Sequence, residues 1–325
     1  MPRAQFRLTY RPPFDWAAAL GFLRARAIDG VEQVDDDVVY RRTIRCGNSH
    51  GTIEAHHDAE RGGLLLDVRG LPSRVVDEAA ARVRRMFDLD ADLDGIAAHL
   101  ARDPWMAPLV AAVPVRRVLR GWDGFEVAVR TIVGQQITVA GARRLNGILV
   151  ERCGARISTA APGGPHRLFP TPDELLAADL SRLGMPGARV AALQAVARAA
   201  IADPGLFEPG ESIEDTVARL RAIRGIGEWT AHYIAMRACG EPDAFPASDV
   251  GLLRGAADAD GRRPAPAELL ARSKAWRPWR AYAAHQLWAV DSNRAAPNGS
   301  AGRAPAGRPI RAQARECAPG SPMRE

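Results

Sequence analysis

Residues 212–231 read SIEDTVARLRAIRGIGEWTA, and this stretch decides how the second half of the chain folds. A capping box begins a helix at Ser212, and apolar residues at helical spacing continue it. Gly225 and Gly227 then allow a tight turn, because glycine adopts backbone conformations that other residues avoid. A second helix follows the turn. The stretch therefore predicts a helix-hairpin-helix over residues 212–239.

The predicted hairpin is suited to binding phosphate. Its turn exposes backbone N–H groups at the start of the second helix, and its glycines let a phosphate approach without obstruction by side chains. Such a turn grips a DNA strand without reading its sequence. The tripeptide Gly-Ile-Gly alone is more often an ordinary turn between helices. The hairpin residues that we expect to contact DNA are Arg224, Gly225, Ile226, Gly227 and Thr230.

A carboxylate follows the hairpin after one helix. Residues 242–250 read PDAFPASDV, which places Asp249 in a proline-bearing loop just before an apolar stretch. A single aspartate in a loop is more often a helix cap than a catalyst, and Ser248 or Asp249 could cap the next helix. The order of hairpin, helix, short loop and aspartate nevertheless resembles the helix-hairpin-helix glycosylase superfamily, whose module ends in a catalytic aspartate.

Further short motifs lie in the order seen in bacterial 3-methyladenine DNA glycosylase II, the AlkA type. They are PPFDW at 12–16, LGFL at 20–23, MFDL at 86–89, GQQI at 134–137, FPTP at 169–172, LGMP at 183–186 and WRPWR at 276–280. The resemblance covers about residues 6–290. It implies an N-terminal α+β domain with a TATA-binding-protein-like sheet, followed by an all-α glycosylase domain.

The hydrophobic patterns of the first part predict an α+β domain over residues 1–102. Strands are expected at 5–10, 38–46 and 64–69, and a helix that Asp15 caps is expected to reach Arg26. An amphipathic helix that Pro72 and Ser73 begin would cover one face of the sheet.

Residues 103–291 are predicted to form a helical domain, because Pro and Gly separate segments of helical periodicity. These segments are 125–133, 139–153, 172–183, 188–201, 213–223, 228–239 and 279–289. Residues 292–325, rich in Ala, Gly, Pro and Arg, are expected to be a disordered tail because they can bury little apolar area.

The charge of the chain is weak evidence for DNA binding. The formal net charge is +6, but residues 292–325 contribute +4 of it from six arginines and two glutamates. Only +2 is left for the two predicted domains. The position of the charge matters more than its sum.

The resemblance implies Asp249 as the catalytic residue. Breaking an N-glycosidic bond builds positive charge on the sugar, which a nearby anion stabilises. An alkylated base such as 3-methyladenine is cationic, and aromatic faces attract cations. The residues that correspond to the base pocket of the family are Phe22, Trp229, Tyr233 and Trp288. Aromatic residues at helical spacing more often pack in a core, which we expect of Trp276 and Trp279.

A glycosylase that flips its base must fill the gap left in the duplex. In the family the wedge follows the Gly-Gln pair, here Gly134 and Gln135, and is apolar in the best-known members. This chain has Gln136 there, with Ile137 next. The departure leaves both Gln136 and Ile137 open as the wedge, and a plain structural turn is a third possibility. Gln135 is also expected to contact DNA.

Lysine usage predicts a glycosylase without lyase activity. Bifunctional members of the superfamily carry a Schiff-base lysine two residues after the second glycine of the hairpin. Trp229 occupies that place, and Lys274, outside the motif, is the only lysine of the chain. We therefore expect hydrolysis of the N-glycosidic bond of alkylated bases and no strand cleavage.

Two other functions stay open: a helix-hairpin-helix protein that binds DNA without chemistry, and a glycosylase for other damaged or mismatched bases.

The four cysteines lie far apart without a C-x-x-C pair, so we expect no metal and no cofactor. No apolar run approaches the length of a membrane span, and the first residues lack the apolar stretch of a secretory signal. We expect a cytoplasmic monomer whose partner is double-stranded DNA containing alkylated bases, with no membrane contact.

Overall fold

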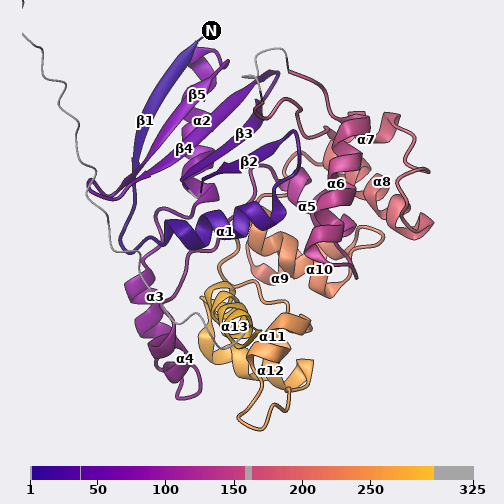
Figure 1. Ribbon diagram of the computed structural model, residues 1–325. Coiled ribbons are helices and arrows are strands. Elements are labelled where there is room, and N and C mark those ends of the chain that lie inside the picture. The colour runs from indigo at the N-terminus through magenta and orange to yellow at the C-terminus, as the bar shows by residue number, and fades with distance from the viewer. Residues whose placement is uncertain (1, 37, 158–162, 296–325) are drawn as a thin grey trace, which may run out of the picture.

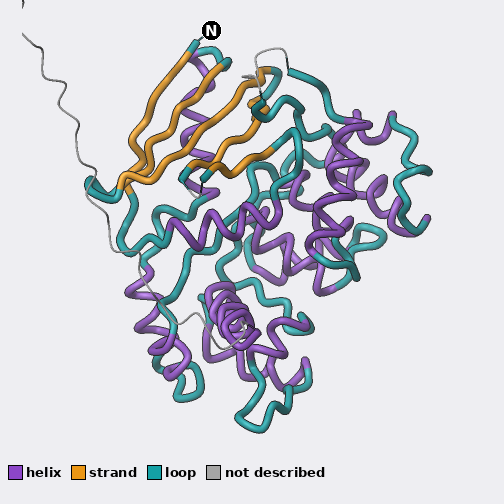
Figure 2. The backbone as a smooth tube through the Cα atoms, in the orientation of Figure 1, coloured by secondary structure: helices purple, strands orange, loops and turns teal. Residues whose placement is uncertain are grey.

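The computed structural model describes residues 2–36, 38–157 and 163–295 (Figure 1). Strands gather at one end of the molecule and helices form the remainder, as the tube in Figure 2 shows. Two large buried cores correspond to this division, one under the sheet and one among the helices. The α+β class with a sheet domain before a helical domain is thus confirmed.

The sheet is antiparallel throughout and has the strand order β1-β5-β4-β3-β2. Its strands are β1 (Arg3–Thr9), β2 (Glu32–Asp35), β3 (Val39–Cys46), β4 (Ser49–Asp58) and β5 (Gly63–Arg69). Alternate side chains of β4 are buried, as expected for a sheet with one face on a core.

The strand β4 has no counterpart in the sequence-based prediction. Its buried positions include Gly51 and Ala55, which carry little or no hydrophobic signal. Gly51 is required there, because a Cβ would lie 2.1 Å from the carbonyl oxygen of Arg69 on the neighbouring strand β5. The strand is therefore specified by close backbone packing more than by hydrophobic alternation.

Two helices complete the N-terminal part. In α1 (Trp16–Arg26), Asp15 caps the first turn by accepting the N–H of Ala18, as its sequence predicts. The helix α2 (Ser73–Met86) contacts β1, β3 and β5 and so lies across the sheet. Both helices bury their apolar residues in the core under the sheet.

Short helices form the second part (Figure 1). They are α3 (Leu93–Leu100), α4 (Ala107–Ala112), α5 (Gly124–Val133), α6 (Val139–Cys153), α7 (Pro172–Ala177), α8 (Gly187–Ala202), α9 (Ile213–Arg221), α10 (Glu228–Ile234), η1 (Ala235–Cys239), α11 (Val250–Gly255), α12 (Pro266–Ser273), η2 (Lys274–Trp276) and α13 (Arg280–Ala295).

Three boundaries differ from the sequence-based expectation. The helix expected over 172–183 ends at Ala177, and Asp179 instead accepts the N–H of Ser181 in a local turn. The helix α13 reaches Ala295, into the segment expected to be disordered, while the remainder of that segment lies outside the described residues. The two cores do not divide at the expected domain boundary, residue 102. The helix α3 precedes that residue but packs in the helical core, and Trp122 follows it but packs in the core under the sheet.

A buried ion cluster joins the two parts. Arg42 of β3 donates to Glu126 of α5 at 2.6 Å, and Arg130 of α5 lies 2.9 Å from Glu32 of β2. The hydroxyl of Tyr40 donates to Glu32 at 2.7 Å. Burial alone would raise the pKa of Glu32, but the charges of Arg130 and Arg42 outweigh it and hold that pKa below its usual value.

We predict that Glu32→Gln destabilises the protein by about 3–5 kcal/mol, because it leaves buried arginine charge without its partner. The depressed pKa of Glu32 also fixes the sign of the pH dependence. Its contribution is present above the pKa of the unfolded carboxyl and is lost as pH falls through the folded pKa. Urea unfolding at pH 7 and pH 4 measures both effects.

The matched control is Glu78→Gln, which removes an exposed carboxylate paired with Arg82 at 2.7 Å on α2. Exposed pairs of this kind contribute at most about 1 kcal/mol. Equal losses of stability in the two variants would refute the view that the buried cluster joins the domains.

Candidate active site

Asp249 lies at the start of α11, and three N–H groups from three elements converge on its carboxylate. Trp229 of α10 donates its indole N–H to Oδ2 at 2.8 Å. Trp288 of α13 donates its indole N–H to Oδ1 at 2.8 Å. The backbone N–H of Leu252 donates to Oδ1 at 3.0 Å. The half-buried carboxylate is thus held in one orientation.

Asp249 both caps a helix and lines a cavity. Its Oδ1 caps α11 through Leu252, while the indoles orient the same carboxylate at the wall of a cavity. The cap belongs to Asp249, not to Ser248. Gly251 makes the arrangement possible, because a Cβ there would lie 2.9 Å from Cδ1 of Trp288.

The four aromatic residues expected at the pocket come together. Trp229 and Tyr233, one turn apart on α10, stack with their ring centroids 5.4 Å apart. Tyr233 meets Trp288 edge-on at 6.3 Å. Phe22 approaches from α1 of the sheet domain and lines the same cavity. Each ring is half-buried, so each keeps a face toward the cavity.

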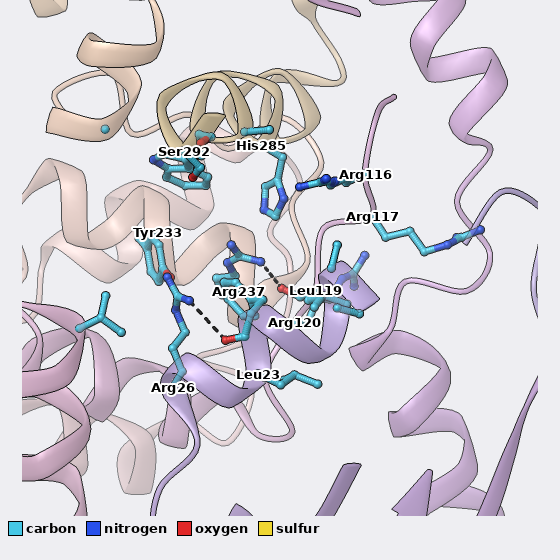
Figure 3. A pocket seen from close by; sticks show the side chains of 18 of the residues that line it. Leu23, Arg26, Arg116, Arg117, Leu119, Arg120, Tyr233, Arg237, His285 and Ser292 are labelled. Carbon is cyan, nitrogen blue, oxygen red and sulfur yellow. Dashed lines mark hydrogen bonds between the residues drawn. The ribbon is translucent and has the colours of Figure 1, made fainter. Parts of the chain in front are cut away.

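Two arginines share this aromatic site, and sequence reasoning missed both. Arg237 of η1 places its guanidinium carbon 4.6 Å from the ring centroid of Phe22. Arg26 of α1 lies 3.9 Å from the same centroid. A signal was present in the spacing, since Arg237 stands four residues after Tyr233 and Arg26 four after Phe22. Figure 3 shows these side chains from close by.

The cavity lies between the two domains and has a volume of about 1170 Å³. Phe22 and Arg26 line it from the sheet domain, and Trp229, Asp249 and Trp288 line it from the helical domain. A ligand in this cavity would therefore touch both domains. Lys274, the only lysine of the chain, does not line this cavity.

The hairpin forms as its glycines predict. Gly225 has φ +91°, and a Cβ there would lie 2.4 Å from Cβ of Ala192 on α8. Gly227 caps α10 without a side chain and faces open space. Ile226 is buried, and its N–H donates to the carbonyl of Ile223 at 3.1 Å, so it serves the turn itself. Arg224 is exposed.

The segment after α5 forms a turn that is tied to the hairpin. The side-chain amide of Gln135 donates to the carbonyl of Gly225 at 3.2 Å and to the hydroxyl of Thr230 at 3.0 Å. Arg189 of α8 donates to the carbonyl of Gln135 at 2.6 Å. Gln135 and the buried Thr230, both expected to contact DNA, thus contact each other.

The tip of this turn is Gln136, which has a left-handed backbone with φ +59° and is exposed. Ile137 is 38% exposed and lines the cavity. The two wedge candidates are therefore placed differently, because Ile137 lines the cavity and the exposed Gln136 does not.

Two further residues of the helical domain, Asp243 and Trp276, have structural partners. Asp243, in the same loop as Asp249, accepts hydrogen bonds from Arg277 and Arg280 at 2.7 Å each. The indole of Trp276 is fully buried and stacks on Trp105 at 5.8 Å, as the core interpretation expects.

No helix in the described part of the chain is long and apolar enough to cross a membrane. Within the same residues, no group of three or more His, Cys, Asp or Glu side chains could hold a metal ion.

Two family descriptions match the chain. The AlkA N-terminal domain matches residues 5–123, and the HhH-GPD superfamily of base excision DNA repair proteins matches residues 129–281. Among solved structures, 3-methyladenine DNA glycosylase from Archaeoglobus fulgidus superposes with a TM-score of 0.77 at 19% identity, covering 90% of this chain and 99% of that one. This likeness shows the fold.

Two curated relatives are closer in sequence. The chain is 38% identical over 285 residues to a probable bifunctional transcriptional activator/DNA repair enzyme AlkA of Mycobacterium tuberculosis, covering 87% of this chain and 56% of that protein. It therefore spans little more than half the length of that relative. DNA-3-methyladenine glycosylase 2 of Escherichia coli is 34% identical, with 87% of this chain and 96% of that protein covered. The chain belongs to the AlkA-type family of DNA-3-methyladenine glycosylases, within the HhH-GPD superfamily.

Proposed function

We propose that this protein hydrolyses the N-glycosidic bonds of alkylated bases that it flips out of duplex DNA, and so initiates base excision repair. The observation that carries the proposal is the carboxylate of Asp249. Three N–H donors fix it at the wall of a cavity lined by Phe22, Tyr233 and two indoles. The family membership supports the same activity.

The fixed carboxylate suits a reaction in which the sugar becomes positive. As the bond from the base to the anomeric carbon breaks, its electron pair leaves with the base and the sugar becomes oxocarbenium-like. An oriented anion stabilises that charge without reorganising. Four lone-pair sites are available on a carboxylate, and three N–H groups occupy three of them. The remaining site, on Oδ2, can orient the attacking water.

DNA binding is assigned to the hairpin and to the turn beside it. The open space at Gly227 leaves room for a phosphate, and the exposed Arg224 adds positive charge. The hydrogen bonds of Gln135 to Gly225 and Thr230 fix the turn at residues 134–137, which holds both wedge candidates, relative to the hairpin. A hairpin that binds the phosphate backbone of one DNA strand would thus place the wedge at a fixed distance from that strand.

Gln136 is the better wedge candidate of the two. It is exposed and does not line the cavity, whereas Ile137 lines the pocket that would receive the base. A wedge must occupy the gap in the base stack, outside the pocket. The long polar side chain of Gln136 could also hydrogen-bond the base that has lost its partner.

Asp249→Asn tests the catalytic role. The amide keeps one oxygen to cap α11, and asparagine is a good N-cap, so the fold should persist. Removal of the charge should lower the single-turnover rate of base release from methylated duplex by at least about 100-fold. DNA affinity, measured by fluorescence anisotropy, should change little.

The matched control is Asp243→Asn in the same loop. It should lower stability through Arg277 and Arg280 but leave the release rate of the folded protein unchanged. Unaltered base release by Asp249→Asn would favour a DNA-binding protein without chemistry and discredit the proposed function.

The wedge assignment predicts a difference between duplex and single-stranded substrate. Gln136→Ala should slow base release from duplex about 5- to 30-fold, a loss of roughly 1–2 kcal/mol from the few that extrusion costs. Release from single-stranded DNA should be nearly unchanged. Ile137→Ala is the comparison, and a larger duplex-specific loss in that variant would transfer the wedge role to Ile137.

The absence of strand cleavage is tested by borohydride. Trp229 stands where lyases carry lysine and is hydrogen-bonded to Asp249. Lys274 is exposed and does not line the cavity. Borohydride should therefore trap no enzyme–DNA adduct through a lysine, and the product should be an intact strand with an abasic site. A lysine-linked adduct seen by mass spectrometry would show that lyase activity exists.

A further inference from the structure

Helix α10 contacts the loop of Asp249 at two places. Trp229 donates its indole N–H to the carboxylate of Asp249 at 2.8 Å. His232, three residues further along the helix, accepts the backbone N–H of Phe245 on its Nδ1 at 3.2 Å. Residues three apart share one face of a helix, so both contacts come from the face that meets the loop. Neither His232 nor Phe245 lines the cavity.

The hydrogen bond from Phe245 fixes a tightly folded part of this loop. Phe245 is 1% exposed, and its ring meets that of Trp276 edge-on at 5.7 Å. The N–H of Ala247 donates to the carbonyl of Phe245 at 2.9 Å. The N–H of Asp249 in turn donates to the carbonyl of Pro246 at 2.8 Å. These turns leave little freedom between Phe245 and Asp249, so the position of the first influences that of the second.

Only a ring of His232 whose Nδ1 carries no proton can make this bond. The backbone N–H of Phe245 needs an acceptor, so the proton of the neutral ring lies on Nε2. That Nε2 lies 3.6 Å from a carboxylate oxygen of Glu228, one turn earlier on α10. When the ring takes up a second proton, Nδ1 becomes a donor that faces another donor, and the bond to Phe245 is lost.

The surroundings of His232 favour the neutral ring. Burial is the largest influence, and it lowers the pKa of His232 below the usual value for histidine. Arg280 of α13 acts in the same direction, whereas Glu228 and Glu214 of α9 oppose it. Glu228 is itself paired with Arg221 at 2.9 Å, which weakens its effect. The neutral form therefore predominates at pH 7.

We propose that His232 is a positioning residue for the glycosylase reaction, because its neutral ring, through the N–H of Phe245, holds the loop that presents Asp249. The inference rests on the proposed function and adds a residue outside the cavity to the same site. A buried N–H without its acceptor is costly, so the loop shifts when the bond is lost. A displacement of about 1 Å can cost a reaction about 100-fold in rate. Acid thus slows base release by protonating His232.

Two substitutions separate the acceptor from the bulk of the ring. His232→Asn places an amide oxygen near the position of Nδ1 and does not titrate. His232→Leu fills similar space and leaves the N–H of Phe245 unpaired. At pH 8, with enzyme in saturating excess over methylated duplex, His232→Leu should release bases about 10-fold more slowly than wild type, and His232→Asn should stay within about 2-fold. DNA affinity, measured by fluorescence anisotropy, should be unchanged in both.

The same rates measured from pH 8 down to pH 4.5 test the titration, after subtraction of spontaneous release without enzyme. Because the folded pKa of His232 is lowered, the contact is fully present above the usual pKa of histidine and is lost as pH falls through the folded value. The ratio of the wild-type rate to the His232→Asn rate should therefore fall toward acid. Titration of any other group affects both rates and cancels in the ratio.

His56→Asn is the matched control. His56 of β4 lies 2.7 Å from Glu54 and does not line the cavity. This variant should keep the pH profile of the wild type.

The proposal is wrong if His232→Asn and His232→Leu slow release by the same factor, since the acceptor would then not matter. It is also wrong if the ratio of wild type to His232→Asn stays constant down to pH 4.5. If wild type releases no base at any pH, the proposed function itself fails, and the positioning role fails with it.

Discussion

The arrangement of the site depends on the hydrogen bonds that hold the carboxylate of Asp249. The donors come from α10, α11 and α13, so one anion joins three helices that are far apart in sequence. The helices must approach closely for this to occur. At Gly255 of α11, a Cβ would lie 2.1 Å from the carbonyl oxygen of Leu287 on α13. Close backbone packing is thus a condition for the geometry of the carboxylate.

The same dependence extends to the sheet domain. Phe22 and Arg26 reach the cavity only because α1 lies against the helical domain. The buried ions between β2, β3 and α5 fix that contact, since charges removed from water are stable only in good mutual geometry. A wall of the cavity is therefore positioned by a cluster that is far from Asp249 in sequence but whose Glu32, Arg42 and Arg130 line the same cavity.

Sequence reasoning worked where local chemistry dictates local structure. The cap at Ser212, the turn at Gly225 and the loop that ends in Asp249 follow from residue type and spacing. It failed where tertiary contact decides. The strand β4 rests on Gly51 meeting a neighbouring strand, and Arg237 reads as an ordinary helical arginine until the fold buries it among the aromatic rings. Neither contact is local, so no window of sequence contains it.

The arginines change what the aromatic residues can be taken to mean. Arg237 lies over Phe22, Tyr233 and Trp288, so these rings already contact a cation of the protein itself. The cavity thus holds an anion on one part of its wall and two cations on another. In the proposed reaction the anion would stabilise the sugar, because the sugar becomes positive as the glycosidic bond breaks.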